Sequence, residues 1–236
     1  MSKDNVLFGI VGLLAGLIIG FVATNYINTR QGVIGNASTS QAGNLPQGHP
    51  EVSDGQNPSQ SLKGAVPEVQ AAIEQAKAEP NNFDAQTKAA TLYEQIQRFD
   101  GAVEFRERAH QINPDDYGTI VKLGDDNYDS EKFEEAEKWY SMALSKKPDA
   151  VDVRTDMGLT FVLRDRPDYD RAIQEFKRSL EFQPNHTKTL QNLTVAYIRK
   201  GDAAEATAAL ARLEALDGSN PAIGKLRSDI EALKAK

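Results

Sequence analysis

The amino-acid sequence predicts an all-α protein, an α-solenoid of stacked helical hairpins preceded by one transmembrane helix and a flexible linker. Three observations support this prediction. Small and aromatic side chains recur through much of the chain at a period close to 34 residues, an uncharged apolar run lies near the N-terminus, and a stretch poor in large apolar residues separates the two. A single hairpin cannot bury its apolar face, so repeated hairpins are expected to stack into one continuous core.

The N-terminal apolar run predicts a membrane anchor within residues 1–30. From Val6 to Ala23 the chain has 18 residues without a charge. A helix of that length spans about 27 Å, close to the ~30 Å hydrocarbon core of a bilayer. A cleaved signal peptide is the main alternative, because it also has a short basic start and an apolar run. This run is long for that role and no small-x-small cleavage pattern follows it closely, so we favour an uncleaved anchor.

The charges beside the run favour one orientation weakly. The amino terminus and Lys3 precede the run, and Arg30 is the nearest cation after it. The resulting difference in positive charge is small. A five-residue leader before a long apolar run is typical of signal anchors whose N-terminus stays inside. We therefore expect a single-pass membrane protein with its repeats on the extracytoplasmic, periplasmic side.

A strip of glycines lies along one face of the predicted span. In lipid, where apolar burial supplies no force, glycines allow two helices to approach closely. One interpretation is an interface for self-association or for docking on another membrane protein. The other is that glycine is simply common in membrane helices. The residues concerned are Gly9, Gly12, Gly16 and Gly20.

Residues 31–64 predict a flexible linker, because Gly, Ser, Gln, Asn and Pro dominate there and cannot offset the entropy cost of ordering. Its root-mean-square reach is about 30 to 35 Å. A helix is expected from Val66 to Glu79, with Pro80 ending it, and it would cover the open end of the first hairpin. The face expected to pack contains Val69, Ala72, Ile73 and Ala76.

The clearest copy of the repeat spans residues 117–150. Two runs with apolar residues three and four apart flank a polar break at Asp129 and Ser130, which predicts a hairpin of two helices. Gly124 and Ala136 are expected to be small because the two backbones approach each other there. Pro148 cannot continue the second helix, and Asp149 beside it is placed to cap the next one. The recurring residues are Leu123, Gly124, Phe133, Ala136, Tyr140, Ala143 and Pro148.

The same frame fits residues 83–116, residues 151–186 with a two-residue longer turn near Pro167, and residues 187–220 with larger residues at several small positions. Residues 221–235 predict a last, capping helix. Over roughly 140 residues this pattern resembles the tetratricopeptide repeat. The resemblance implies a right-handed solenoid of about four repeats within a domain covering residues 65–236.

The resemblance also implies a concave groove lined by the first helix of each repeat, in which a segment of a partner protein binds. The corresponding side chains are acidic at the first end of the groove and apolar at the second. We therefore expect a partner segment with apolar anchors and a basic flank. Alternatively, the apolar residues pack against neighbouring helices. The groove positions are Asp84, Thr87, Thr91 and Glu94, then Val121, Asp125 and Tyr128, then Asp152, Thr155, Leu159 and Val162, and finally Lys188, Gln191, Val195 and Ile198.

Composition and motifs argue against an enzyme. The net charge of −7 disfavours nucleic acid, and the absence of cysteine excludes disulfides and thiolate metal sites. The acidic run from Asp125 to Asp129 lacks the glycine turn and closing Glu of a calcium loop, so we expect a solvated helix end. We expect neither a cofactor nor a metal. The sequence predicts a membrane-tethered scaffold for protein partners. Proteins of this general plan are similar to bacterial factors that assist cytochrome c maturation or secretion-associated folding, and this similarity implies the alternative, an accessory subunit of such a membrane complex recruited through the transmembrane helix.

Overall fold

The computed structural model describes residues 58–235. The predicted membrane anchor at residues 1–30, its glycine strip and the first part of the predicted linker lie outside this range. Within it, all regular secondary structure is α-helical, in agreement with the predicted fold class. No helix between residues 58 and 235 is both long and apolar enough to cross a bilayer.

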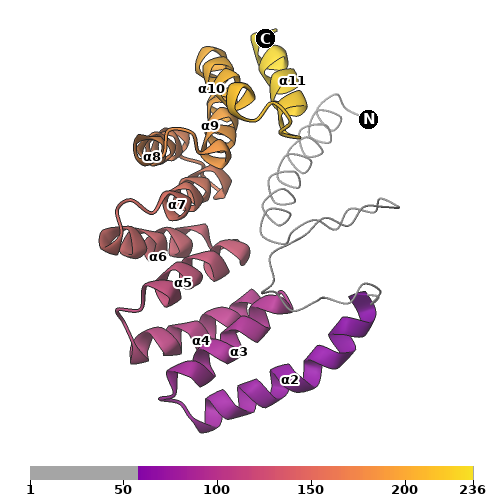
Figure 1. The fold of residues 1–236 in the computed structure, drawn as a ribbon, viewed down its shortest axis with the longest axis vertical. Coiled ribbons are helices and arrows are strands. Elements are labelled where there is room, and N and C mark those ends of the chain that lie inside the picture. Colours follow the sequence, from indigo (N-terminus) through magenta and orange to yellow (C-terminus); the bar gives the residue numbers. More distant parts are fainter. Residues whose placement is uncertain (1–57, 236) are drawn as a thin grey trace, which may run out of the picture. The chain divides into compact units, whose positions relative to one another are not determined.

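Ten helices follow one another through the described range, and α3 to α10 form four antiparallel hairpins stacked in chain order (Figure 1). The first helices of the hairpins begin at the first residues of the four predicted repeats. The helices are α2 (Pro58–Ala78), α3 (Phe83–Gln95), α4 (Phe99–Ile112), α5 (Tyr117–Asp129), α6 (Phe133–Lys146), α7 (Val151–Leu163), α8 (Tyr169–Phe182), α9 (Thr187–Lys200), α10 (Ala203–Leu216) and α11 (Ile223–Lys234).

The stack has two sides. Figure 1 shows the first helices α3, α5 and α7 along one side and the second helices α4, α6 and α8 along the other. The second helix of each hairpin packs on the first helix of the next, and α7 also touches α9. Each hairpin is therefore covered by its neighbours, which is how a solenoid obtains a continuous core.

Small side chains lie where the paired helices meet. Gly124 of α5 faces the Tyr140 ring of α6, and a Cβ added to Gly124 would stand 2.4 Å from Tyr140 Cε1. Gly158 of α7 meets the Phe176 ring of α8 in the same way, at 2.5 Å. The expected backbone-to-backbone approach at Gly124 is thus a contact of backbone with an aromatic ring. The small residue is required because the ring occupies the space that a Cβ would take.

The fourth hairpin solves the same packing problem with a different pair of residues. Thr194 replaces the glycine and Leu210 replaces the aromatic ring, and both side chains are buried. A larger residue on the first helix is thus matched by a smaller one on the second. Such compensation is expected in close-packed interiors, where the total volume matters more than each residue.

The terminal helices close the two ends of the stack. In α2, Val69, Ala72 and Ala76 are buried, and the two alanines join the core of the first hairpin. The Gln86 amide of α3 donates a buried hydrogen bond of 2.6 Å to the Ala76 carbonyl, which satisfies one of the carbonyls in the C-terminal turn of α2. At the other end α11 packs on α9 and α10. Its buried residues are Ile223, Leu226 and Ile230, while Leu233 is half-buried.

Two sequence-based expectations about helix ends are wrong. Helix α2 begins at Pro58 and not at Val66, so the last part of the predicted linker is helical. Asp149 does not cap α7, because the turn after Pro148 takes one more residue and Ala150 becomes the N-cap. The same extra residue makes Asp116 the cap of α5, where its carboxylate accepts from the Thr119 N–H at 2.7 Å.

The packing of Tyr140 on Gly124 gives a direct test of the hairpin contact. Gly124→Ala places a methyl group inside the ring's contact distance, so we expect the free energy of unfolding to fall by about 1 to 3 kcal/mol. Urea denaturation of the full chain measures this change. Gly224→Ala in α11 is the matched control, because a Cβ there meets nothing within 4 Å. Equal stability of the two variants would contradict the proposed contact.

Candidate partner-binding face

The predicted groove residues all lie on the first helices α3, α5, α7 and α9, but their accessibility differs widely. Asp84, Thr91 and Asp152 are exposed. Thr87, Glu94, Val121, Lys188, Val195 and Ile198 are half-buried. Asp125, Tyr128, Thr155, Leu159, Val162 and Gln191 are buried.

The apolar part of the predicted groove divides into core and surface. Leu159 and Val162 of α7 are only 3% and 6% exposed, so they pack within the protein. Val121, Val195 and Ile198 retain part of their surface. The accessible apolar area on the first helices is therefore smaller than the sequence suggests, and its α9 part lies next to the capping helix α11.

The acidic end of the groove contains one free carboxylate and one that is already paired. Asp84 is exposed, whereas Glu94 accepts from Lys122 at 2.7 Å and from Arg106 at 2.9 Å. The Lys122 pair links α3 to α5 across two repeats. Asp84 and the distant Asp152, 76% exposed at its side chain, are thus the carboxylates best placed to attract a basic partner.

The acidic run from Asp125 to Asp129 is mostly buried, contrary to the expected solvated helix end. Asp126 is 0% exposed, and its Oδ2 accepts from Arg106 Nε at 2.6 Å. The Asn127 amide donates to the Leu123 carbonyl at 2.8 Å, and the Tyr140 hydroxyl donates to Asp125 at 3.0 Å. The run is buried because these partners, from three different helices, take the place of water.

Arg106 explains why sequence reasoning missed this network. It stands on α4 at the place in the repeat that Tyr140 and Phe176 occupy in the next two hairpins. A guanidinium at a core aromatic position needs a buried acceptor, and Asp126 on the following helix supplies one. An arginine interrupting the aromatic series was the only signal of this pair in the sequence.

The ionisation of Asp126 is opposed by its surroundings. Burial raises the pKa of Asp126 to about 7, outweighing the attraction of Arg106, and the nearby carboxylates Glu94 and Asp125 push in the same direction as burial. The second oxygen, Oδ1, is buried and has no hydrogen-bond partner within the described range. The folded protein therefore holds a proton on Asp126 more tightly than the unfolded chain does.

A second buried polar chain joins the third and fourth repeats. His186 Nδ1 lies 2.6 Å from Thr189 Oγ1, which lies 2.7 Å from Thr155 Oγ1. On its other side, His186 Nε2 stands 3.3 Å from a carboxylate oxygen of Asp152. Burial lowers the pKa of His186 despite this carboxylate. Thr155, a predicted groove residue, is thus part of the contact between α7 and α9.

Other ion pairs join successive repeats at the surface. Lys132 donates to Asp100 at 2.6 Å, and Lys146 donates to Asp115 at 2.6 Å. Their partners are largely exposed, so each pair contributes little to stability. Across residues 67–235 we find no cluster of three His, Asp or Glu side chains arranged to hold a metal ion.

These features define an α-solenoid of stacked hairpins whose first helices share one partly exposed face of acidic and apolar residues. Residues 163–230, from the end of α7 into α11, match the family model of the tetratricopeptide repeat. This match covers α8, α9, α10 and most of α11. No curated protein matches the chain in sequence.

Solved structures share the fold at low sequence identity. The chain is similar to YrrB, described as a TPR protein with an unusual peptide-binding site, with a TM-score of 0.61 and 15% identity over 72% of this chain and 86% of that one. It is also similar to MamA, with a TM-score of 0.59 and 19% identity over 68% and 86%. MamA from Desulfovibrio magneticus gives 0.59 and 16%, over 69% and 92%. These likenesses and the family match support the tetratricopeptide-repeat resemblance.

The raised pKa of Asp126 predicts a pH dependence of stability. A carboxyl that binds its proton more tightly when folded contributes stability that is present at low pH and lost as the pH rises through about 7. Asp126→Asn mimics the neutral form. We therefore expect its urea midpoint to vary less than that of the wild type between roughly pH 5 and 8.

A surface aspartate provides the control for this experiment. Asp115 pairs with Lys146, which lowers its pKa, so it stays ionised over this pH interval. Asp115→Asn should keep the wild-type pH profile. An unchanged profile in Asp126→Asn would show that Asp126 does not titrate there.

Proposed function

We propose that this protein is a non-enzymatic scaffold that binds a segment of a partner protein along the first-helix face of its repeats. The observation that carries the proposal is that the first helices present two kinds of residue on one face. Asp84 and Asp152 are exposed carboxylates. The half-buried apolar residues are Val121, Val195 and Ile198. The tetratricopeptide-repeat fold supports protein partners as a class. YrrB, a TPR protein of similar fold with an unusual peptide-binding site, supports the same class of partner.

The charges indicate what the partner segment contains. Asp84 lies on α3 at the first end of the face, whereas Val195 and Ile198 lie on α9 near the other end. A segment with basic residues at one end and apolar residues at the other would match both. Apolar side chains would supply most of the binding free energy, and the basic end would fix the direction.

A random peptide library tests this proposal. Peptides selected on the immobilised full chain should combine a basic flank with apolar anchors. The double variant Asp84→Lys and Asp152→Lys should bind them at least about tenfold more weakly, because it reverses the charge that attracts the basic flank. Isothermal titration measures the loss.

The control for this variant is a charge reversal on the opposite side of the stack. Glu107 is exposed on the second helix α4, so Glu107→Lys should leave the affinity unchanged. Two results would exclude the first-helix face as the site. One is a set of selected peptides that share no basic and apolar pattern. The other is equal binding by the Asp84→Lys, Asp152→Lys variant and the Glu107→Lys control.

We also propose that an N-terminal helix tethers the scaffold to a membrane, with the repeats on the extracytoplasmic side. The support is the uncharged run of 18 residues from Val6 to Ala23, preceded by Lys3. A tether would hold the partner close to the bilayer, because the linker limits how far the repeats can move away.

An accessory subunit of a membrane complex is the second candidate function. The glycine strip favours it, because glycines at Gly12, Gly16 and Gly20 would let another membrane helix approach closely. In that case the complex is recruited through the anchor, and a chain starting at residue 58 loses its partners. Under the first proposal the shortened chain keeps them.

Fractionation tests the tether. The full chain should remain with membranes after a carbonate wash, and a chain starting at residue 58 should not. The protein has no cysteine, so Asp149→Cys at an exposed turn provides a single labelling site. We expect a membrane-impermeant maleimide to label it from the extracytoplasmic side. Release of the full chain by carbonate would exclude the anchor, and labelling only after lysis would reverse the orientation.

A further inference from the structure

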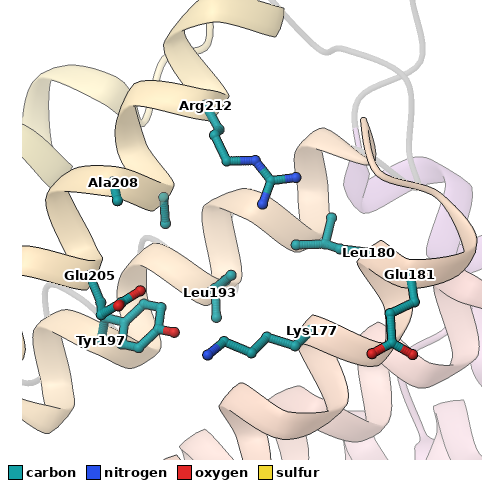
Figure 2. Close-up of a pocket in the computed structure, with 9 residues that line it drawn as sticks. Lys177, Leu180, Glu181, Leu193, Tyr197, Glu205, Ala208 and Arg212 are labelled. Carbon is teal, nitrogen blue, oxygen red and sulfur yellow. The ribbon is translucent and has the colours of Figure 1, made fainter.

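A pocket opens on the side of the stack formed by the second helices, away from the face discussed above. It has a volume of about 300 Å³ and is lined by residues of α8, α9 and α10 (Figure 2). A hollow of about 540 Å³ continues from it and shares four of its residues. The smaller pocket is lined by Lys177, Leu180, Glu181, Leu193, Tyr197, Glu205, Ala208, Ala209 and Arg212.

The repeat itself explains why there is space here. Trp139 is the seventh residue of α6, and it packs edge-on against His110, the twelfth residue of α4, with ring centroids 5.0 Å apart. The seventh residue of α10 is Ala209, and the twelfth residue of α8 is Leu180. Trp139 thus fills the space between α4 and α6, whereas Ala209 leaves the equivalent space between α8 and α10 open.

A buried hydroxyl beside this space has no acceptor. Tyr197 is only 4% exposed, and its hydroxyl finds no acceptor within residues 67–235. Figure 2 shows this hydroxyl turned toward Lys177, among the side chains that line the pocket. Hydrogen bonding of the Lys177 ammonium to the Tyr197 hydroxyl oxygen raises the pKa of Lys177. An ammonium can only donate, however, so the hydroxyl hydrogen of Tyr197 still needs an acceptor.

The rim supplies cations suited to an aromatic ring. The Lys177 ammonium already lies 5.7 Å from the centroid of the Tyr197 ring, and Arg212 lines the pocket from α10, opposite Lys177 of α8. The face of an aromatic ring is negative and attracts such cations. Glu181 and Glu205 offset the two positive charges, which disfavours an anion as the occupant.

From these observations we propose that the pocket between α8 and α10 accepts an aromatic side chain from a partner protein, with a partner backbone carbonyl accepting from Tyr197. The ring would occupy the place that Trp139 fills between α4 and α6. Leu180, Leu193 and Ala209 would contact its apolar surface, and Lys177 and Arg212 would border its face. The pocket is at the lower end of ligand-site volumes, which suits one side chain. This surface is separate from the first-helix face and does not depend on the function proposed for it.

The full chain, labelled at its Ala and Leu methyl groups and placed in lipid nanodiscs, is titrated with N-acetyl-L-tryptophanamide and followed by methyl NMR. This compound carries both an indole ring and amide carbonyls. We expect saturable methyl shifts at Leu180, Leu193 and Ala208, and no comparable shifts with N-acetyl-L-leucinamide. Absence of saturable shifts at these residues, or equal binding of the leucine derivative, would overturn the proposal.

Two tryptophan variants place the binding site. Ala209→Trp fills the pocket from within and should abolish the shifts, whereas Ala211→Trp adds the same ring at an exposed site on α10 and should retain them. Equal shifts in both variants would exclude the pocket. If Ala209→Trp does not fold, Tyr197→Phe decides. Loss of the hydroxyl should weaken binding about two- to tenfold, and an unchanged affinity would contradict the assigned hydrogen bond.

Discussion

The architecture depends on how closely the two helices of a hairpin approach. In the second and third hairpins an aromatic ring of the second helix lies against a glycine of the first, as Tyr140 does on Gly124 and Phe176 on Gly158. This contact sets the distance between the paired helices. That distance in turn sets the surface that each hairpin offers to the next. In the fourth hairpin Thr194 and Leu210 occupy these two positions, and both are buried although the residues differ.

In the first hairpin no aromatic ring occupies this position, and ion pairs are found there. Arg106 stands at the aromatic position and is paired with Asp126 from the next repeat and with Glu94 from its own. Such a pair is costly to desolvate, and removing one member would leave a buried charge without a partner. It joins two successive hairpins through a directional polar contact. The chain of Thr155, Thr189 and His186 joins the third and fourth repeats in a similar way.

The two sides of the stack are suited to different kinds of contact. The first helices present separated carboxylates and partly exposed apolar residues along several repeats. This arrangement favours binding of an extended partner segment that contacts several repeats at once. The second helices have fewer buried residues, and a pocket opens among them at Ala209. A repeat protein can carry both kinds of surface because each hairpin contributes to both sides. A change in one residue of the repeat then opens or closes a site without altering the fold.

The sequence by itself determined the helical hairpins, their number and their starting residues, because small, aromatic and proline residues at a fixed period encode contacts within one hairpin. It also placed the groove positions on the first helices. Only the tertiary structure decided which of those positions are accessible. Leu159 and Val162 became core, and the run from Asp125 to Tyr128 became buried, because their surroundings come from other repeats. Periodicity predicts which face of a helix points inward. It does not predict which side chains of the neighbouring repeat cover the other positions. The pocket at Ala209 has the same origin, since an alanine opens a space only when the facing helix does not fill it.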